Sequence, residues 1–266
     1  MIPEAVLAHV PAFLMVLFRI SGIFIFAPLL GSSTVPMRMK VIFALGLAGC
    51  VYPMLLMPGR PAAELMGASI GHEVHLWALG AAVAVELLIG LAIGFGATLP
   101  IIAAQVGGHV IDQQMGLGLA GVYNPELNEQ SGVVGEFYFL AAVAIFVIMG
   151  GHRVLLVTVA GSFDHVPLGG FDNFGGLLAL MLGLMQSMFE LALKVAAPLL
   201  AVIFLETVAM GFMARTVPQM NIMSVGFALR IMLGALVLIA AVVPQFDEVA
   251  QAIQFTMRRL MLVFAM

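Results

Sequence analysis

Long apolar segments, separated by short polar ones, follow one another along almost the whole chain. A helix that crosses a membrane needs about 20 mostly apolar residues. We therefore predict six apolar helices, over residues 10–30, 41–57, 76–104, 137–160, 177–213 and 225–243. Alternating segments of the kind that form β-barrel strands do not occur in the sequence. The pattern predicts an all-α polytopic membrane protein, with residues 1–266 in a single membrane domain.

Prolines and the C-terminal periodicity refine these elements. Pro36 suits the start of the second helix, and Pro198 divides the fifth, which must tilt strongly, kink or form two elements. Residues 244–266, after Pro244, form a separate amphipathic tail in this interpretation. Its apolar positions repeat at helical spacing: Val249, Ile253, Met257 and Leu260.

Composition supports a membrane protein and excludes other classes. Hydrophobic residues make up 63% of the chain and charged residues 9%, whereas soluble domains have about 45–50% and 25%. The mean hydropathy is +1.16 and the net charge is −4, which argues against a disordered chain and against a basic nucleic-acid binder. The lone Cys50 has no partner for a disulfide within the chain. Residues 1–10 contain no Lys or Arg, so we expect the first apolar segment to stay as an anchor rather than to be a secretory signal.

Ionisable residues lie inside the predicted helices, where each costs at least about 2.5–3.5 kcal/mol at mid-membrane. They are Arg19, Glu86, Arg153, Glu190, Lys194, Glu206 and Arg230. We expect Glu190 and Lys194 to pair on one helix face. Arg19 and Arg230 need acidic partners, for which Glu86 and Glu206 are candidates, and Arg153 needs a partner across helices. The set is interpreted as structural pairs, with a proton or ion path and contacts to other subunits as alternatives.

Glycine marks two further segments. Gly90 and Gly94, four residues apart, predict a close approach of two helices. Residues 105–136 are glycine-rich, polar and free of basic residues, so we predict a loop there. Such a segment survives at membrane depth only where protein or a water-filled cavity surrounds it. The sequence therefore predicts either an exposed loop or a re-entrant element that lines or blocks a pore.

Motifs for catalysis, metals or cofactors are weak or missing in the sequence. His72 and His75 are three residues apart and do not form the H-E-x-x-H zinc motif. The sequence also lacks the nucleophile elbow, the Walker lysine motif and the dinucleotide fingerprint. We therefore expect no enzyme, no metal site and no cofactor.

Five stretches together resemble the FliR family of flagellar export-gate proteins. They are FRISGIFIFAPLLGSSTVPMRMKVIFAL (residues 18–45), GGHVIDQQMGLGLAGVYNPE (107–126), MGGHRVLL (149–156), SFDHVPLG (162–169) and RTVPQMNIMSVGFALRI (215–231). The resemblance implies a subunit of a bacterial type III export apparatus in the inner membrane, within the flagellar basal body. It implies FliP- and FliQ-like partners in a helical pore assembly, with FlhB- and FlhA-like proteins nearby and unfolded export substrates passing through.

The resemblance also implies that the central loop, over residues 105–136, contributes a plug to the closed pore. The residues expected to act there are Gly107, Gly108, Asp112, Gln113, Met115, Gly116 and Gly118. Glycine flexibility would let the loop move aside, and polar side chains would hold it closed. Three alternatives stay open: the SctT subunit of a virulence secretion system, a secondary transporter with a site near Pro198, Lys194 and Glu206, and a scaffold with no pore role.

Overall fold

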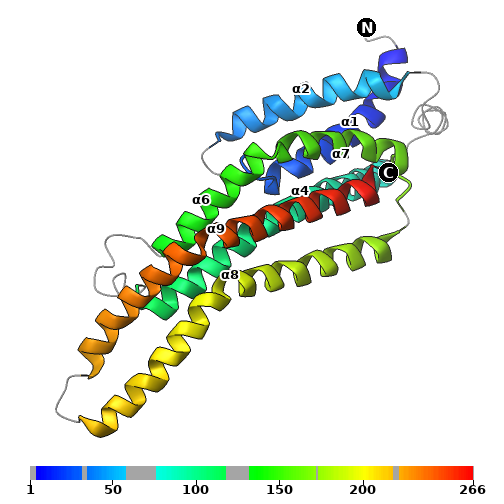
Figure 1. The fold of residues 1–266 in the computed structure, drawn as a ribbon. Helices are drawn as coiled ribbons and strands as arrows, with labels where there is room; N and C mark the ends of the chain where they lie inside the picture. The colour runs from blue at the N-terminus through cyan, green and yellow to red at the C-terminus, as the bar shows by residue number, and fades with distance from the viewer. Residues whose placement is uncertain are drawn as a thin grey trace. The chain divides into compact units, whose positions relative to one another are not determined.

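The chain folds into helices, as the hydrophobic pattern predicts. The computed structural model describes residues 4–31, 35–57, 76–117, 132–171, 173–217 and 222–265. Within these ranges it contains seven helices and no strand (Figure 1). Five helices are long and apolar enough to cross a membrane, or six if one broken pair forms a single span. The prediction of an all-α polytopic membrane protein is confirmed.

The first two predicted helices are close to those observed. Helix α1 spans Glu4–Phe26 and helix α2 spans Met37–Leu55, directly after Pro36 at its N-cap position. The prediction of a helix start at Pro36 is thus confirmed, because the fixed φ of proline suits a helix start. Helix α8, Phe174–Thr216, is one continuous helix that contains Pro198, rather than two elements.

Three predicted boundaries are wrong. Helix α4, Leu76–Met115, continues well past residue 104, so the segment 105–136 is a loop only in part. The predicted helix 137–160 is two helices, α6 (Val133–Ile148) and α7 (Gly151–His165), with left-handed Gly150 at the break. Helix α9, Ile222–Phe264, passes through Pro244, so residues 244–264 continue a helix instead of forming a separate tail. The apolar face predicted for this end is confirmed, since Val249, Ile253, Met257 and Leu260 are all buried.

The helices belong to two compact units. The first contains residues 1–98, 149–184 and 254–266, and therefore α1, α2, α7 and one end of α4, α8 and α9. Helices α1 and α2 pack side by side in it (Figure 1). A side chain added to Gly22 would meet the carbonyl oxygen of Leu87 at 2.6 Å, and one added to Gly94 would meet that of Ile23 at 2.9 Å. The close approach predicted from the glycine spacing therefore occurs, between α1 and α4.

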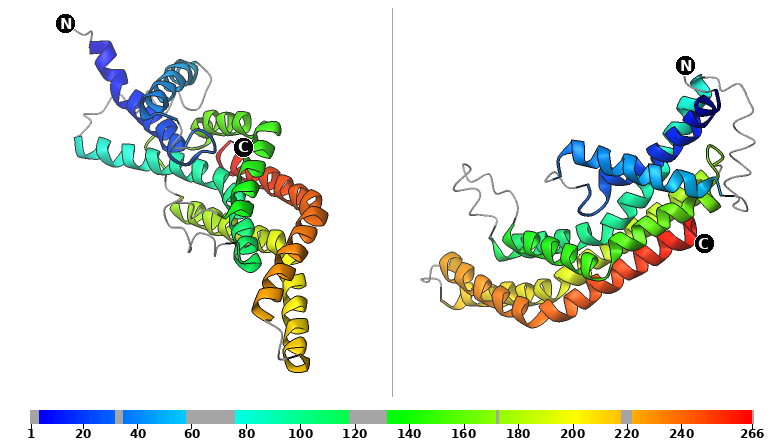
Figure 2. Two further views of the ribbon diagram at one scale, coloured as in Figure 1. Left: turned by 90° about the vertical axis from the view of Figure 1, so that its left-hand side faces the viewer. Right: turned by 90° about the horizontal axis from the view of Figure 1, so that it is seen from above.

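The second unit contains residues 99–148 and 185–253, and is described separately. It contains α6, the carboxyl end of α4 and the long paired segments of α8 and α9, which run side by side (Figure 2). Gly107 on α4 leaves room for Val195 on α8, and Met115 packs against Gly234 on α9. Small residues thus let these helices come close in this unit as well.

Gly90 provides a direct test of the α1–α4 contact. A Cβ atom at this position would overlap the backbone carbonyl oxygen of Arg19, which cannot move without shifting α1. We expect Gly90→Ala to destabilise the protein by about 1–3 kcal/mol, measured as a lower midpoint of thermal unfolding in detergent. Gly46→Ala is the matched control, because nothing lies within 4 Å of a Cβ there. Equal midpoints for both variants would contradict the close packing.

Candidate functional site

A fully buried ion pair lies at the centre of the first unit. Arg19 Nε on α1 donates to Glu86 Oε2 on α4 at 2.5 Å, and both side chains are 0% exposed. The expectation that Arg19 has an acidic partner, with Glu86 and Glu206 as candidates, is confirmed, and the partner is Glu86. A lone buried charge would be strongly destabilising, so each residue depends on the other.

The rest of the Arg19 guanidinium binds the end of helix α7. Nη1 donates to the carbonyl oxygen of Ser162 at 3.0 Å and to its Oγ at 3.2 Å, while Nη2 donates to the carbonyl oxygen of Val166 at 3.1 Å. The guanidinium also lies 4.4 Å from the centre of the Phe163 ring. The Ser162 carbonyl also accepts a hydrogen bond from Val166 N at 2.9 Å. Carbonyls at a helix C-terminus carry partial negative charge, so a cation stabilises this end.

Glu86 fixes the turn that follows α7. Its second oxygen, Oε1, accepts a hydrogen bond at 2.9 Å from the backbone N–H of Gly169, whose φ is +71°. That φ lies in the left-handed region that favours glycine. Arg19 and Glu86 together therefore hold α1, α4, the end of α7 and its following turn in one arrangement. Because both charged groups are buried and each is bound to backbone groups as well as to the other, this network is suited to structure.

The other predicted charges form separate pairs in the second unit. Arg230 Nη2 lies 3.1 Å from Glu206 Oε2, and Lys194 Nζ lies 3.3 Å from Glu190 Oε1 and 3.6 Å from Glu248 Oε2. The pairings of Arg230 with Glu206 and of Lys194 with Glu190 are confirmed. Lys194 and Glu206 thus bind different partners, which argues against the single transporter site suggested by the sequence.

Arg153 differs from the other ionisable residues. It lies exposed in the first turn of α7, directly after the break at Gly150. It makes no ion pair with another residue in the described ranges. The expectation that Arg153 lies within a membrane helix and pairs across helices was based on a continuous helix over 137–160, which the structure does not contain.

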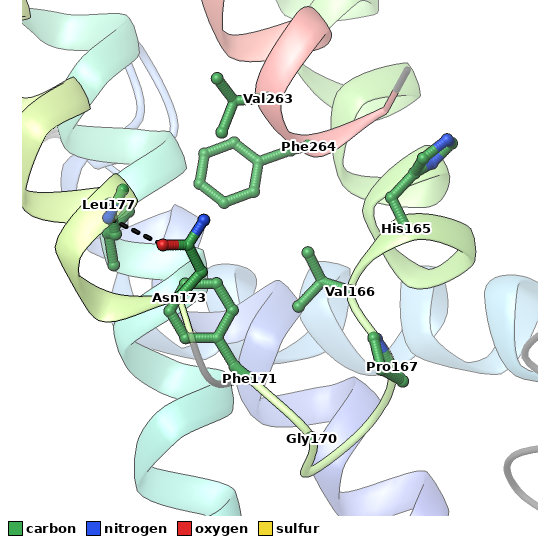
Figure 3. A pocket seen from close by; sticks show the side chains of 10 residues that line it. His165, Val166, Pro167, Gly170, Phe171, Asn173, Leu177, Val263 and Phe264 are labelled. Atoms are coloured by element: carbon green, nitrogen blue, oxygen red, sulfur yellow. Dashed lines mark hydrogen bonds between the residues drawn. The ribbon is translucent and has the colours of Figure 1, made fainter.

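A cavity of about 420 Å³ lies in the first unit, beside the turn that Glu86 fixes (Figure 3). Apolar side chains dominate its wall, among them Phe171, Phe264 and Val263. Its polar Asn173 accepts a hydrogen bond through Oδ1 from Gly176 N at 2.9 Å, which caps the start of α8. No sequence pattern indicates this cavity, because its walls combine residues 165–177 with Val263 and Phe264 near the other end of the chain.

The structure divides the residues expected to form the plug. Gly107, Gly108, Asp112, Gln113 and Met115 all lie on α4, and Gly116 follows directly after it. Gly118 lies outside the described residues. The placement of Gly107 and Gly108 in a loop is wrong, because both are buried helical residues at close contacts. Tertiary packing outweighs the propensity cost of about 1 kcal/mol that each glycine carries in a helix.

Gly116 ends helix α4 in a specific way. Its φ is +77°, its N–H donates to the carbonyl of Gln113 at 3.2 Å, and the N–H of Leu117 donates to the carbonyl of Asp112 at 3.1 Å. This pair of bonds is the Schellman motif, which needs a left-handed residue after the helix. Gly116 is therefore the residue at which the chain leaves α4.

The side chain of Asp112 reaches the next helix in the chain. Its two oxygens accept hydrogen bonds from the backbone N–H groups of Val134, at 3.1 Å, and Gly135, at 2.8 Å, in the first turn of α6. His109 Nδ1 lies 4.0 Å from the same carboxylate. The sequence singled out Asp112 but not this role, since the two helices meet only in the fold.

The described residues give no support for a metal centre. No group of three or more His, Cys, Asp or Glu side chains in the described ranges is placed to hold a metal ion. His72 and His75 lie outside the described residues.

Comparison with known proteins covers nearly the whole chain. Residues 10–256 match the family described as "Bacterial export proteins, family 1". The chain is 32% identical over 249 residues to the flagellar biosynthetic protein FliR of Bacillus subtilis (strain 168), covering 92% of each chain. It is 29% identical to FliR of Escherichia coli (strain K12), over 86% of this chain and 82% of the relative. A protein named Yop proteins translocation protein T, from Yersinia pestis, is 25% identical, over 70% of this chain and 72% of the relative. The chain belongs to family 1 of the bacterial export proteins, which confirms the resemblance to FliR.

Proposed function

We propose that this chain is a gate subunit of the flagellar type III protein export apparatus, where it helps to form the entry channel for unfolded export substrates. The match to the export family over residues 10–256, with FliR relatives along nearly the full length, carries this proposal. Helices long enough to span a membrane agree with it. The similarity to Yop proteins translocation protein T makes the virulence-type SctT role the second candidate.

The proposed setting is the bacterial inner membrane, at the flagellar basal body. The partners are FliP- and FliQ-like subunits in a common assembly, with FlhB- and FlhA-like export proteins beside it. Exposed apolar side chains on α8 and α9 support such contacts, for example Leu193, Phe204, Met232 and Ile239. Surfaces of this kind are buried by lipid or by other subunits. The role is structural and conducting, without catalysis, metal or cofactor.

We further propose that the Gly-rich segment after α4 contributes the plug of the closed pore. The support is chemical: a polar, glycine-rich segment cannot face lipid, so it needs a protein or water-filled surrounding. Gly107, Gly108, Asp112 and Met115 belong to its rigid base on α4, where they pack or form hydrogen bonds. Gln113 is exposed on this base, and Gly116 follows directly after α4. Gly118 belongs to the Gly-rich segment that we propose as the plug.

Removing residues 118–131 tests the plug. Both flanks of this segment bond to Asp112, through Leu117 N on one side and Val134 N on the other, so a short Gly-Ser linker can join them. We expect the assembled deletion variant to leak ions, because removing material from a closed pore opens a path for water. Single-channel conductance in planar bilayers measures the leak. The control is a variant with the same residues in scrambled order, which keeps the volume.

Assembly must be verified before conductance is interpreted. Copurification with the FliP- and FliQ-like partners at the yield of the unmodified complex provides that check. If the assembled deletion variant conducts no more ions than the unmodified complex, this segment is no plug. That result would favour the scaffold role or a constriction formed by partner subunits.

Arg19 tests the structural role of the buried charges. We expect Arg19→Ala to lower the yield of the coexpressed complex at least tenfold, because it leaves Glu86 buried without a partner, at a cost of about 3–5 kcal/mol. Size-exclusion chromatography of the detergent-solubilised complex gives the yield. Arg153→Ala is the matched control, since Arg153 is exposed and unpaired among the described residues. Normal yield with an altered pH dependence of export would instead favour a proton path.

A further inference from the structure

The first turn of helix α6 takes its cap from another helix. Gly132 occupies the N-cap position, because its carbonyl accepts the first helical hydrogen bond, from Glu136 N at 3.0 Å. A glycine has no side chain with which to bind the free N–H groups of the first turn. The carboxylate of Asp112, on α4, accepts two of them, from Val134 and Gly135.

The space around the Asp112 carboxylate leaves no room for a side chain at Gly132 or Gly108. A Cβ atom at Gly132 would overlap Oδ2 of Asp112, and one at Gly108 would lie 2.7 Å from the Cα atom of Gly135. The backbones of α4 and α6 therefore touch, and the Asp112 side chain is 4% exposed. Glycine at positions 108, 132 and 135 lets the carboxylate reach the N–H groups.

Asp112 also takes part in ending its own helix. Its carbonyl oxygen accepts the hydrogen bond from Leu117 N that completes the Schellman motif after α4. One residue thus terminates α4 through its backbone and begins α6 through its side chain. The negative charge also suits the N-terminus of α6, where the helix dipole is positive.

Other charged groups do not replace this contact. His109, one turn earlier on α4, is the sole ion-pair neighbour of Asp112 in the described ranges, at 4.0 Å, and Glu136 follows on α6. Of the three basic groups on α8 and α9 in this unit, Lys194 and Arg230 pair with the carboxylates Glu190, Glu206 and Glu248, and Arg215 lies in the last turn of α8.

We infer that Asp112 is a positioning residue of the export gate: its carboxylate fixes the amino end of α6 to the carboxyl end of α4. This sets the separation of Leu117 and Gly132, the described residues on either side of segment 118–131. The inference rests on the proposed gate function, because the helix ends it fixes are those that flank the proposed plug. The contact between Asp112 and α6 involves described residues alone, and it can be measured independently of the plug.

Hydrogen exchange in the assembled complex tests the contact. In Asp112→Ala we expect backbone amides in residues 133–140 to exchange about fivefold faster, the loss typical of a removed helix cap. Asp112→Asn should give a smaller increase, since its amide oxygen still accepts one hydrogen bond. Gly132→Ala should resemble Asp112→Ala although it keeps the carboxylate, because the new methyl group displaces it.

Two matched controls belong to the same experiment. Gln113→Ala changes the exposed neighbour of Asp112 on α4, and Gly211→Ala adds a methyl group where nothing lies within 4 Å. Neither should change exchange in α6. If Asp112→Ala fails to assemble, Gly132→Ala and Asp112→Asn still decide the question. Unchanged exchange in all assembled Asp112 and Gly132 variants would overturn the inference.

Conductance of the same complexes separates this inference from the proposed plug. We expect Asp112→Ala and Gly132→Ala to leak, and Asp112→Asn to leak less. If the 118–131 deletion leaks but these variants exchange faster without leaking, the plug stands and Asp112 fixes α6, but the inferred role of this contact in the gate is wrong. If the deletion does not leak, the plug is wrong, and the exchange result alone decides whether Asp112 positions α6.

Discussion

Burial of a charge in an apolar interior is the constraint on which this structure depends. Arg19 and Glu86 are completely buried, and neither is tolerable without the other. Their hydrogen bonds also hold the end of α7 and the turn at Gly169, so one ion pair orders four parts of the first unit. The pair thus joins elements of the first unit that are distant in the sequence.

The same demand for partners applies to the backbone at helix ends. Val134 and Gly135 would leave N–H groups unpaired in a buried place, and Asp112 supplies the acceptors from another helix. In the first unit, the guanidinium of Arg19 donates hydrogen bonds to two carbonyls at the end of α7. The acidic Asp112 lies at the N-terminus of α6 and the basic Arg19 at the C-terminus of α7, the ends where the helix dipole favours each charge. Side chains that look like candidates for transport chemistry therefore serve as fixed structural partners.

The sequence predicted the features that have a local cost. Buried charges must pair, so the sequence predicted acidic partners for Arg19 and Arg230, and glycines four apart predicted a close approach of two helices. Which carboxylate binds which arginine, and which helices meet, came only from the fold. The sequence failed where tertiary packing outweighs local propensity. Gly107 and Gly108 favour a loop, yet α4 continues through them because its neighbours need the space. Pro244 suggested a helix end, but α9 passes through it. The cap from Asp112 joins residues more than twenty positions apart, which no local pattern shows.

We propose that this chain is a gate subunit and that its Gly-rich segment lies inside the pore. A density map of the complex purified with FliP- and FliQ-like partners is the decisive measurement. We expect this chain within a helical assembly, with the carboxyl end of α4 and the amino end of α6 next to the central channel. A map in which these two helix ends face lipid, or in which the chain is absent from the assembly, would contradict it.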